Sequence, residues 1–209
     1  MAGHPVFARV YTRLRPAMDR QGALEHRQRM LAGLTGRVVE VGPGDGGNFA
    51  CYPATVTGVV AVEPEPFLRA RATAAAATAP VPVEVVDGTA ERLPLAAATV
   101  DAAVVSLVLC SVRDQAAALA ELQRVLRPGG ELRFYEHVAA GTPGLRRLQA
   151  VADRTVWPLL LAGCHTGRDT VTAIGAAGFA VEEVDHFRFP EGTLAGPASP
   201  HVLGRARRS

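Results

Sequence analysis

The stretch that decides the fold runs from Val38 to Phe49 and reads VVEVGPGDGGNF. Its first four residues have the apolar, β-branched character of a buried strand. The next six, Gly42 to Gly47, include four glycines, which permit a tight turn and let backbone N–H groups approach a ligand closely. A helix that follows such a turn favours an anionic group at its N-terminus. The stretch therefore predicts a strand, a ligand-binding turn and a helix.

Short β-branched runs alternate with helical stretches along the rest of the chain, and helices are expected between the first five strands. The clearest helix is Ala116–Leu126, which Pro128-Gly129-Gly130 ends. Alternation of this kind predicts an α/β fold with a mostly parallel sheet. Residues 190–200 cannot hold a crossover helix, so the last two strands should pair antiparallel. The expected strands are Arg37–Val41, Val56–Val62, Val83–Val86, Asp101–Leu107, Glu131–Val138, Phe179–Phe189 and His201–Arg207.

The length of 209 residues suits a single domain, 1–209. Residues 1–35 and 144–165 both have helical patterns outside the sheet. Each is expected either to form a lid over the ligand site or simply to cover the sheet. Phe7, Tyr11 and Trp157 are the aromatic residues in these segments that fit a lid, and core packing is the alternative for them.

The composition excludes several classes of protein. All 22 basic residues are arginine, which excludes Schiff-base, pyridoxal-phosphate and P-loop enzymes because these need a lysine amine. A net charge of +2 gives no electrostatic case for nucleic acid or membrane. The three cysteines lack zinc-ligand spacing, so no metal site and no disulfide is expected. Without an apolar run of roughly 20 residues, we expect a cytoplasmic protein, as a monomer or a homodimer.

The glycine spacing fits two kinds of cofactor site. Gly42, Gly44 and Gly47 satisfy G-x-G-x-x-G, the dinucleotide fingerprint, whereas Glu40 with Gly42, Gly44 and Gly46 satisfies E-x-G-x-G-x-G. The carboxylate of Glu40 would repel a pyrophosphate but attract a ligand that carries ammonium and sulfonium groups. The chain also has no room for a separate substrate domain. These features favour S-adenosylmethionine over a dinucleotide.

Five segments in order resemble the class I S-adenosylmethionine-dependent methyltransferases of the methyltransferase domain 11 type. They read VVEVGPGDGG, AVEPEP, DGTAERLPL, DAAVVSLVLCSV and VLRPGGELRFYEHV. The resemblance implies a Rossmann-like, doubly wound sheet of seven strands, with the last strand antiparallel and helices on both faces. It also implies S-adenosylmethionine as the cofactor and S-adenosylhomocysteine as its product.

The same resemblance implies the positions of the cofactor-binding residues. Glu40 would lie by the methionine amino group, Glu63 would hold the ribose hydroxyls and Pro64 would pack near the adenine. Thr89 stands where the family has an aspartate facing the adenine, and Asp87 lies two residues earlier. The full implied set is Glu40, Gly42, Pro43, Gly44, Asp45, Gly46, Asn48, Glu63, Pro64, Gly88, Thr89, Ala90, Ser106 and Leu107.

The segment after the fourth strand bears on the methyl acceptor. Ser106-Leu107-Val108-Leu109 is apolar and lacks the [Asp/Asn]-Pro-Pro-aromatic pattern that nucleic-acid and glutamine methyltransferases often carry. Residues 100–165 are similar to the methyltransferase-like family that includes membrane-associated alkyl-thiol S-methyltransferases. Those relatives carry an apolar N-terminal anchor, and this chain is expected to be without one. A small thiol is therefore the favoured acceptor. Transfer to nitrogen, oxygen or carbon of a phospholipid amine or a natural product is the alternative.

Thiol methylation needs a thiolate, so a nearby histidine could act as a general base. His137 follows the fifth predicted strand and is the first candidate, with His165 the second and Glu136 placed to orient either ring. The alternative for His137 is a hydrogen-bonded residue that shapes the pocket. Cys110 and Cys164 lie in apolar segments and are expected in the core.

Overall fold

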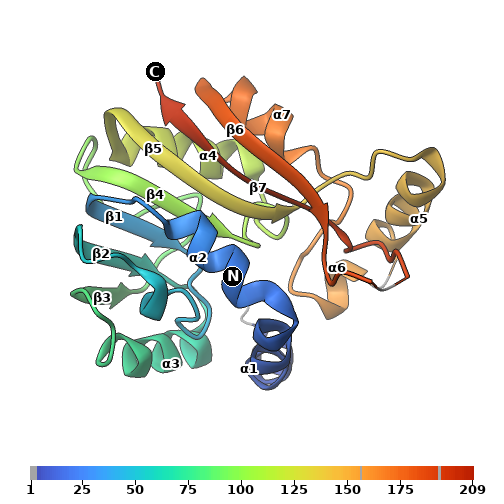
Figure 1. Cartoon of the computed structure of the whole chain (residues 1–209), viewed down its shortest axis with the longest axis horizontal. Coiled ribbons are helices and arrows are strands. Elements are labelled where there is room, and N and C mark those ends of the chain that lie inside the picture. The colour runs from blue at the N-terminus through green and yellow to red at the C-terminus, as the bar shows by residue number, and fades with distance from the viewer. Residues whose placement is uncertain (1–3, 156, 193) are drawn as a thin grey trace.

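The computed structural model, drawn in Figure 1, describes residues 4–155, 157–192 and 194–209. Its centre is a seven-stranded sheet in the order β3-β2-β1-β4-β5-β7-β6. β1 to β5 pair in parallel, and β7 runs antiparallel to both β5 and β6. The expected doubly wound α/β sheet with an antiparallel last strand is confirmed. The strands are β1 (Gly36–Val41), β2 (Val56–Val62), β3 (Val83–Val86), β4 (Val100–Ser106), β5 (Leu126–His137), β6 (Phe179–Arg188) and β7 (Pro200–Arg208).

Helices cover both faces of the sheet because the strands alternate their side chains between two apolar cores. On β1, Val39 and Val41 belong to the core under α4 and α7, whereas Val38 belongs to the core under α2 and α3. Figure 1 shows α5 and α6 beyond the ends of β5 and β7. The helices are α1 (Pro5–Met18), α2 (Leu24–Leu31), α3 (Pro66–Ala76), α4 (Gln115–Val125), α5 (Pro143–Asp153), α6 (Trp157–Leu160) and α7 (Thr170–Ala176).

The prediction of a helix in every gap between the first five strands was wrong at two places. Between β1 and β2 the described chain forms turns and a 3₁₀ turn, Phe49–Cys51, instead of an α-helix. Gly44 and Gly46 both adopt left-handed backbone angles there, and Pro53 follows closely, so no helix can propagate. The gap between β3 and β4 is also without a helix in the described residues. The glycine turn therefore offers backbone N–H groups without a following α-helix.

The antiparallel end of the sheet depends on a glycine in β7. Gly204 pairs with Phe134 on one side and Val184 on the other. A methyl group at Gly204 would lie 2.5 Å from the Phe134 ring, far inside van der Waals contact. The site must therefore remain glycine for the three strands to pack.

Gly204→Ala is expected to destabilise the protein by about 1–3 kcal/mol, the usual cost of overpacking a core. Chemical denaturation would measure the change in the free energy of unfolding. Gly175→Ala is the matched control, because Gly175 is exposed on α7 with open space around it. That control should be neutral or stabilising by up to about 1 kcal/mol. Equal stability of Gly204→Ala and wild type would contradict the strand packing.

None of the helices in the described residues combines the length and apolar character needed to span a membrane.

Candidate functional site

A cavity of about 930 Å³ lies at the carboxyl ends of β1, β2, β4 and β5, and α1 supplies one of its walls. Ligands of doubly wound sheets bind at this edge, where the loops after neighbouring strands converge. The volume lies at the upper end of the range for cofactor-sized ligands. Eleven of the predicted site residues line it: Gly42, Pro43, Gly44, Asn48, Glu63, Pro64, Ala90, Ser106, Leu107, His137 and His165.

Four residues of the glycine turn line the cavity: Gly42, Pro43, Gly44 and Gly47. Gly42 and Gly44 line it with φ angles of +64° and +61°, which side chains rarely adopt. A methyl group at Gly42 would lie 2.6 Å from a methyl of Val108, and one at Gly44 would lie 3.1 Å from the Tyr11 ring. Gly46 differs, because a methyl group there would meet Ala75 of α3 at 2.8 Å. We conclude that Gly46 serves the packing of the turn rather than the cavity wall.

The carboxylate of Glu40 acts through a neighbour. Glu40 is 1% exposed and accepts hydrogen bonds from Asn48 Nδ2 and Tyr52 Oη, both at 2.8 Å. Among the described residues, Asn48 lines the cavity, whereas Glu40 does not. The Oδ1 atom of Asn48 is buried and has no hydrogen-bond partner in the described part of the chain. Asn48 therefore lies between the Glu40 carboxylate and the cavity.

Glu63 follows β2 and presents its carboxylate to the cavity. Its Oε2 accepts from the Gly44 N–H and its Oε1 from the Glu65 N–H, each at 3.0 Å. Ionised carboxylate oxygens have several acceptor positions, so Glu63 can still accept from a ribose hydroxyl. Burial raises the pKa of Glu63 to about 7, against the opposing effect of these two hydrogen bonds. Burial likewise raises the pKa of Glu40 to about 7.

The segment expected to face adenine contributes less than predicted. Ala90 lines the cavity, but Gly88 and Thr89 are not among the described lining residues. Thr89 forms a β-bridge with Arg92, and a methyl group at Gly88 would meet Val62 at 2.8 Å. The carboxylate of Asp87 is paired with Arg69 at 2.9 Å. The Thr89–Arg92 bridge and the Asp87–Arg69 pair hold the turn after β3, and Ala90 and Glu91 are the residues of this segment that line the cavity.

The N-terminal segment both lines the cavity and covers the sheet. Phe7 and Tyr11 of α1 line the cavity, whereas α2 buries its apolar residues against the sheet. Arg15 of α1 pairs with the buried carboxylate of Asp45 at 2.8 Å. Asp45 therefore joins the glycine turn to α1, and it is not among the described residues that line the cavity. In the second segment Leu160 and residues 161–165 line the cavity, and α5 and Trp157 do not, within the described residues.

The chain turns sharply where β4 ends. Ser106 and Leu107 line the cavity, as expected. Leu107 has a φ of +59°, an uncommon conformation for a residue with a side chain. Its N–H donates to the carbonyl of Tyr135 at 2.7 Å. Strained backbone of this kind is retained mainly at functional sites, and here it turns the chain into the cavity wall.

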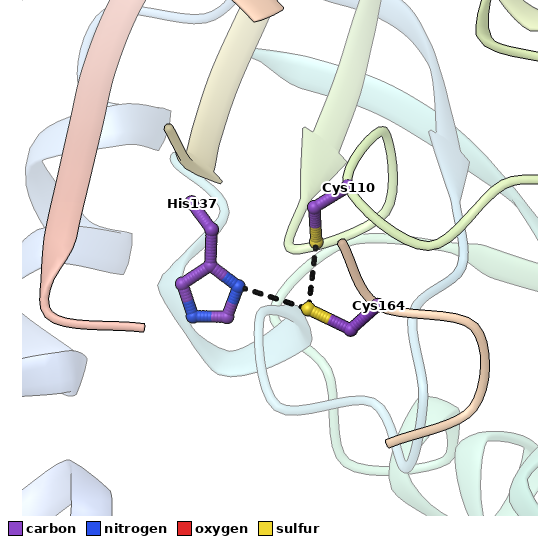
Figure 2. Close-up of side chains that lie close together, drawn as sticks. All are labelled: Cys110, His137 and Cys164. Carbon is purple, nitrogen blue, oxygen red and sulfur yellow. Dashed lines mark hydrogen bonds between the residues drawn. The ribbon is translucent and has the colours of Figure 1, made fainter. Parts of the chain in front are cut away.

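Two cysteines and a histidine meet beyond this turn, as Figure 2 shows. Cys110 lies in the turn after β4, His137 ends β5 and Cys164 lies in the loop after α6. The Cys110 and Cys164 sulfurs are 3.8 Å apart, and Cys164 Sγ lies 3.4 Å from His137 Nδ1. All three residues line the cavity. The cysteines were expected in the core, and they are buried, but at a wall of the cavity. Hydrogen bonds with Cys110 and His137 lower the pKa of the Cys164 thiol.

Glu136 does not orient a histidine, in contrast to the prediction. Its carboxylate accepts hydrogen bonds from the N–H groups of Val108 and Leu109 at 2.9 Å and Cys110 at 3.1 Å. Successive side chains on a strand point to opposite faces, so Glu136 turns away from His137 and holds the turn after β4. His165 lines the cavity and places its Nδ1 2.7 Å from the Gly163 carbonyl, which can only accept. The lone pair of that ring is therefore on Nε2.

Comparison with known proteins agrees with the cavity and the fold. A family described as "Methyltransferase domain" matches residues 39–134. The chain is 35% identical to Thiol S-methyltransferase TMT1B of Mus musculus over 84% of this chain and 73% of that protein. It is 31% identical to the ubiquinone/menaquinone biosynthesis C-methyltransferase UbiE of Syntrophotalea carbinolica, over 63% of this chain and 56% of that protein.

Among solved structures, a geranyl diphosphate methyltransferase in complex with S-adenosylmethionine superposes with a TM-score of 0.69 at 17% identity. The match covers 90% of this chain and 85% of that one. The chain belongs to the class I S-adenosylmethionine-dependent methyltransferases and uses S-adenosylmethionine as its cofactor.

Proposed function

We propose that this methyltransferase transfers the methyl group of S-adenosylmethionine to the sulfur of a small thiol. The observation that carries the proposal is the 35% identity to a thiol S-methyltransferase over 84% of the chain. The cavity supports it, because Val108, Leu160 and Leu161 line it with apolar side chains. An apolar wall excludes water and suits the alkyl part of a small thiol.

The cofactor would occupy the part of the cavity between the glycine turn and Glu63. Asn48, backed by the Glu40 carboxylate, would accept from the methionine ammonium, and Glu63 would accept from the ribose hydroxyls. Pro64 and Ala90 would border the adenine. Ser106 and Leu107 lie further along the wall and would border the reactive methyl group. This assignment keeps the predicted ribose contact and moves the ammonium contact from Glu40 to Asn48.

Transfer to sulfur needs a thiolate in line with the methyl carbon and the departing sulfur. A free thiol has a pKa of about 8.5, so only a small fraction is ionised at neutral pH. We place His137 beside the acceptor, where it promotes formation of the thiolate, with His165 as the second candidate. The thiolate then forms the new S–C bond while the bond from the methyl carbon to the sulfonium breaks. The products are a thioether and S-adenosylhomocysteine.

Cofactor binding should depend on pH because both buried carboxylates titrate near neutrality. The pKa values of Glu40 and Glu63 are about 7 before the ligand binds. A cationic ligand that donates hydrogen bonds favours their ionised forms. Affinity should therefore be full above pH 7 and fall below it, by up to about tenfold per pH unit for each carboxylate that must ionise.

Calorimetric titration of the protein with S-adenosylmethionine from pH 5.5 to pH 8.5 would measure this dependence. The glutamine in Glu63→Gln does not ionise in this pH range. The affinity of this variant for S-adenosylmethionine should therefore be weaker than that of wild type but change less with pH. A pH-independent affinity for the wild-type protein would contradict the assignment of these two residues.

Transfer to carbon is the second candidate function, because the chain is also similar to a quinone C-methyltransferase. Methyl transfer from isotope-labelled S-adenosylmethionine to a panel of small thiols, phenols, amines and quinone precursors, read by mass spectrometry, distinguishes the two. A labelled thioether is the expected product. Label confined to carbon, oxygen or nitrogen would refute the thiol acceptor and leave the fold and cofactor unchanged.

A further inference from the structure

The meeting of Cys110, His137 and Cys164 is not explained by methyl transfer alone. Their ligating atoms all lie within 4.8 Å of one another, and they come from three separate segments of the chain (Figure 2). Two thiol sulfurs and an imidazole nitrogen are soft and borderline donors, the set that Zn²⁺ prefers. Residue spacing did not indicate such a site, because zinc motifs are recognised by ligands close together in the chain.

Two of the three ligand–ligand distances match those of a tetrahedral zinc site. With Zn–S near 2.3 Å and Zn–N near 2.0–2.1 Å, two sulfur ligands lie about 3.8 Å apart and a sulfur and a nitrogen about 3.5 Å apart. The observed separations are 3.8 Å between the Cys110 and Cys164 sulfurs and 3.4 Å between Cys164 Sγ and His137 Nδ1. The remaining pair, Cys110 and His137, lies within 4.8 Å. A contraction of that pair by at most about 1.3 Å would complete the ligand triangle.

We propose that Cys110, His137 and Cys164 bind one Zn²⁺ ion, with the fourth coordination position open to the cavity. All three residues line that cavity. Three protein ligands with one open position are typical of catalytic zinc sites, whereas structural sites have four protein ligands. Two thiolates also neutralise the charge of the ion.

The surrounding hydrogen bonds hold the three ligands in place. Glu136 accepts from the Cys110 N–H at 3.1 Å and thereby ties the turn after β4 to the residue before His137. The N–H of His165 donates to the Cys110 carbonyl at 2.8 Å, which ties the Cys164 loop to the same turn. Outer contacts of this kind commonly fix the ligands of metal sites. Glu136 is therefore a positioning residue for the site.

The open position suggests a role that rests on the proposed function. A thiol that binds Zn²⁺ does so as the thiolate. The acceptor thiol would displace a zinc-bound water and give its proton to that water, which leaves as hydronium. The zinc-bound sulfur would then attack the methyl carbon, and the neutral thioether, a weaker ligand, would leave. In this account His137 promotes thiolate formation as a metal ligand.

Metal binding is measured on the full chain without any methyl transfer. Protein treated with a chelator under reducing conditions is titrated with Co²⁺, and Zn²⁺ affinity is obtained by competition. Wild type is expected to bind one ion per chain with thiolate-to-cobalt charge-transfer absorption. Cys51→Ser is the matched control, because Cys51 is the third free cysteine and lies outside the group. It should bind like wild type, whereas Cys164→Ser and His137→Gln should bind roughly a hundredfold more weakly.

Several results would overturn the proposal. They are wild-type protein without charge-transfer absorption, a Cys110–Cys164 disulfide in place of bound metal, or equal affinity in Cys164→Ser and Cys51→Ser. The charge-transfer absorption of the wild-type protein tests the metal site even if a variant fails to fold. Adding a small alkyl thiol to the cobalt protein tests the open position, since a new thiolate should change the spectrum. An unchanged spectrum would refute that position. Because neither readout uses methyl transfer, failure of the thiol acceptor and failure of the metal site are distinguished.

Discussion

Replacing Gly44 with arginine is expected to abolish the binding of S-adenosylmethionine. Gly44 has a φ of +61° and lines the cavity, and even a methyl group there would lie 3.1 Å from the Tyr11 ring. The arginine side chain would fill the space that the cofactor needs, and its charge would repel the cationic ligand. We expect the dissociation constant to rise at least about a hundredfold, or about 2.7 kcal/mol. Calorimetric titration would measure the dissociation constant.

A control variant separates this effect from general damage. Gly175→Arg adds the same side chain to the exposed surface of α7, where the structure has open space. It should bind the cofactor like wild type. Thermal unfolding of both variants reports whether the fold survives, because Gly44→Arg also strains the backbone. A folded Gly44→Arg protein with wild-type affinity would refute the position of the cofactor.

Replacing His137 with alanine should slow methyl transfer to a thiol by roughly a hundredfold while cofactor affinity stays unchanged. The ring ends β5 at the wall of the cavity, 3.4 Å from the Cys164 sulfur. Without it, the acceptor thiol loses the group that promotes its ionisation. Turnover numbers and the dissociation constant of S-adenosylmethionine would be measured separately.

The pH profile adds a second readout for His137. If the ring promotes thiolate formation, the loss of rate in His137→Ala should shrink at high pH, where the thiol ionises unaided. His186→Ala is the matched control, because His186 is exposed on β6 away from the cavity. A wild-type turnover number in His137→Ala would remove His137 from the reaction.

The sheet could be predicted because its signals are local. β-branched runs mark the buried strands, and the short connection before β7 specifies antiparallel pairing. The segment after β1 was predicted less well. The general strand–turn–helix pattern indicated a helix there, but left-handed glycines and Pro53 stop it. Local backbone chemistry prevailed over the pattern at that point.

Several residues predicted to bind the cofactor line the cavity because of their place in the chain. Gly42, Gly44 and Glu63 lie at or shortly after the carboxyl end of a parallel strand, the edge where the cavity lies. Glu40 and Asp45 were assigned by motif, yet their carboxylates are engaged by Asn48 and Arg15. A sequence motif does not show which side chains lie nearby in the folded protein, so these partners could not be predicted from it.

The acceptor end of the cavity could not be predicted from sequence. Cys110, His137 and Cys164 are 27 residues apart at each step, and only the folding of the loop after α6 onto the turn after β4 joins them. An apolar segment around each cysteine indicated a core residue, and burial confirmed that part. Glu136 and His137 are neighbours on a predicted strand, so their side chains point to opposite faces of the sheet. This difference could have been predicted from the sequence.

Sulfur is the proposed methyl acceptor, and competition with oxygen and nitrogen tests this choice. The most direct test offers an alkyl thiol, the alcohol and the amine of the same carbon skeleton together, at equal concentration, with isotope-labelled S-adenosylmethionine. Mass spectrometry then reports which heteroatom carries the label. We expect a labelled thioether as the dominant product, lost in Gly44→Arg and strongly reduced in His137→Ala. Label on oxygen or nitrogen, with the thiol left unmethylated, would contradict it.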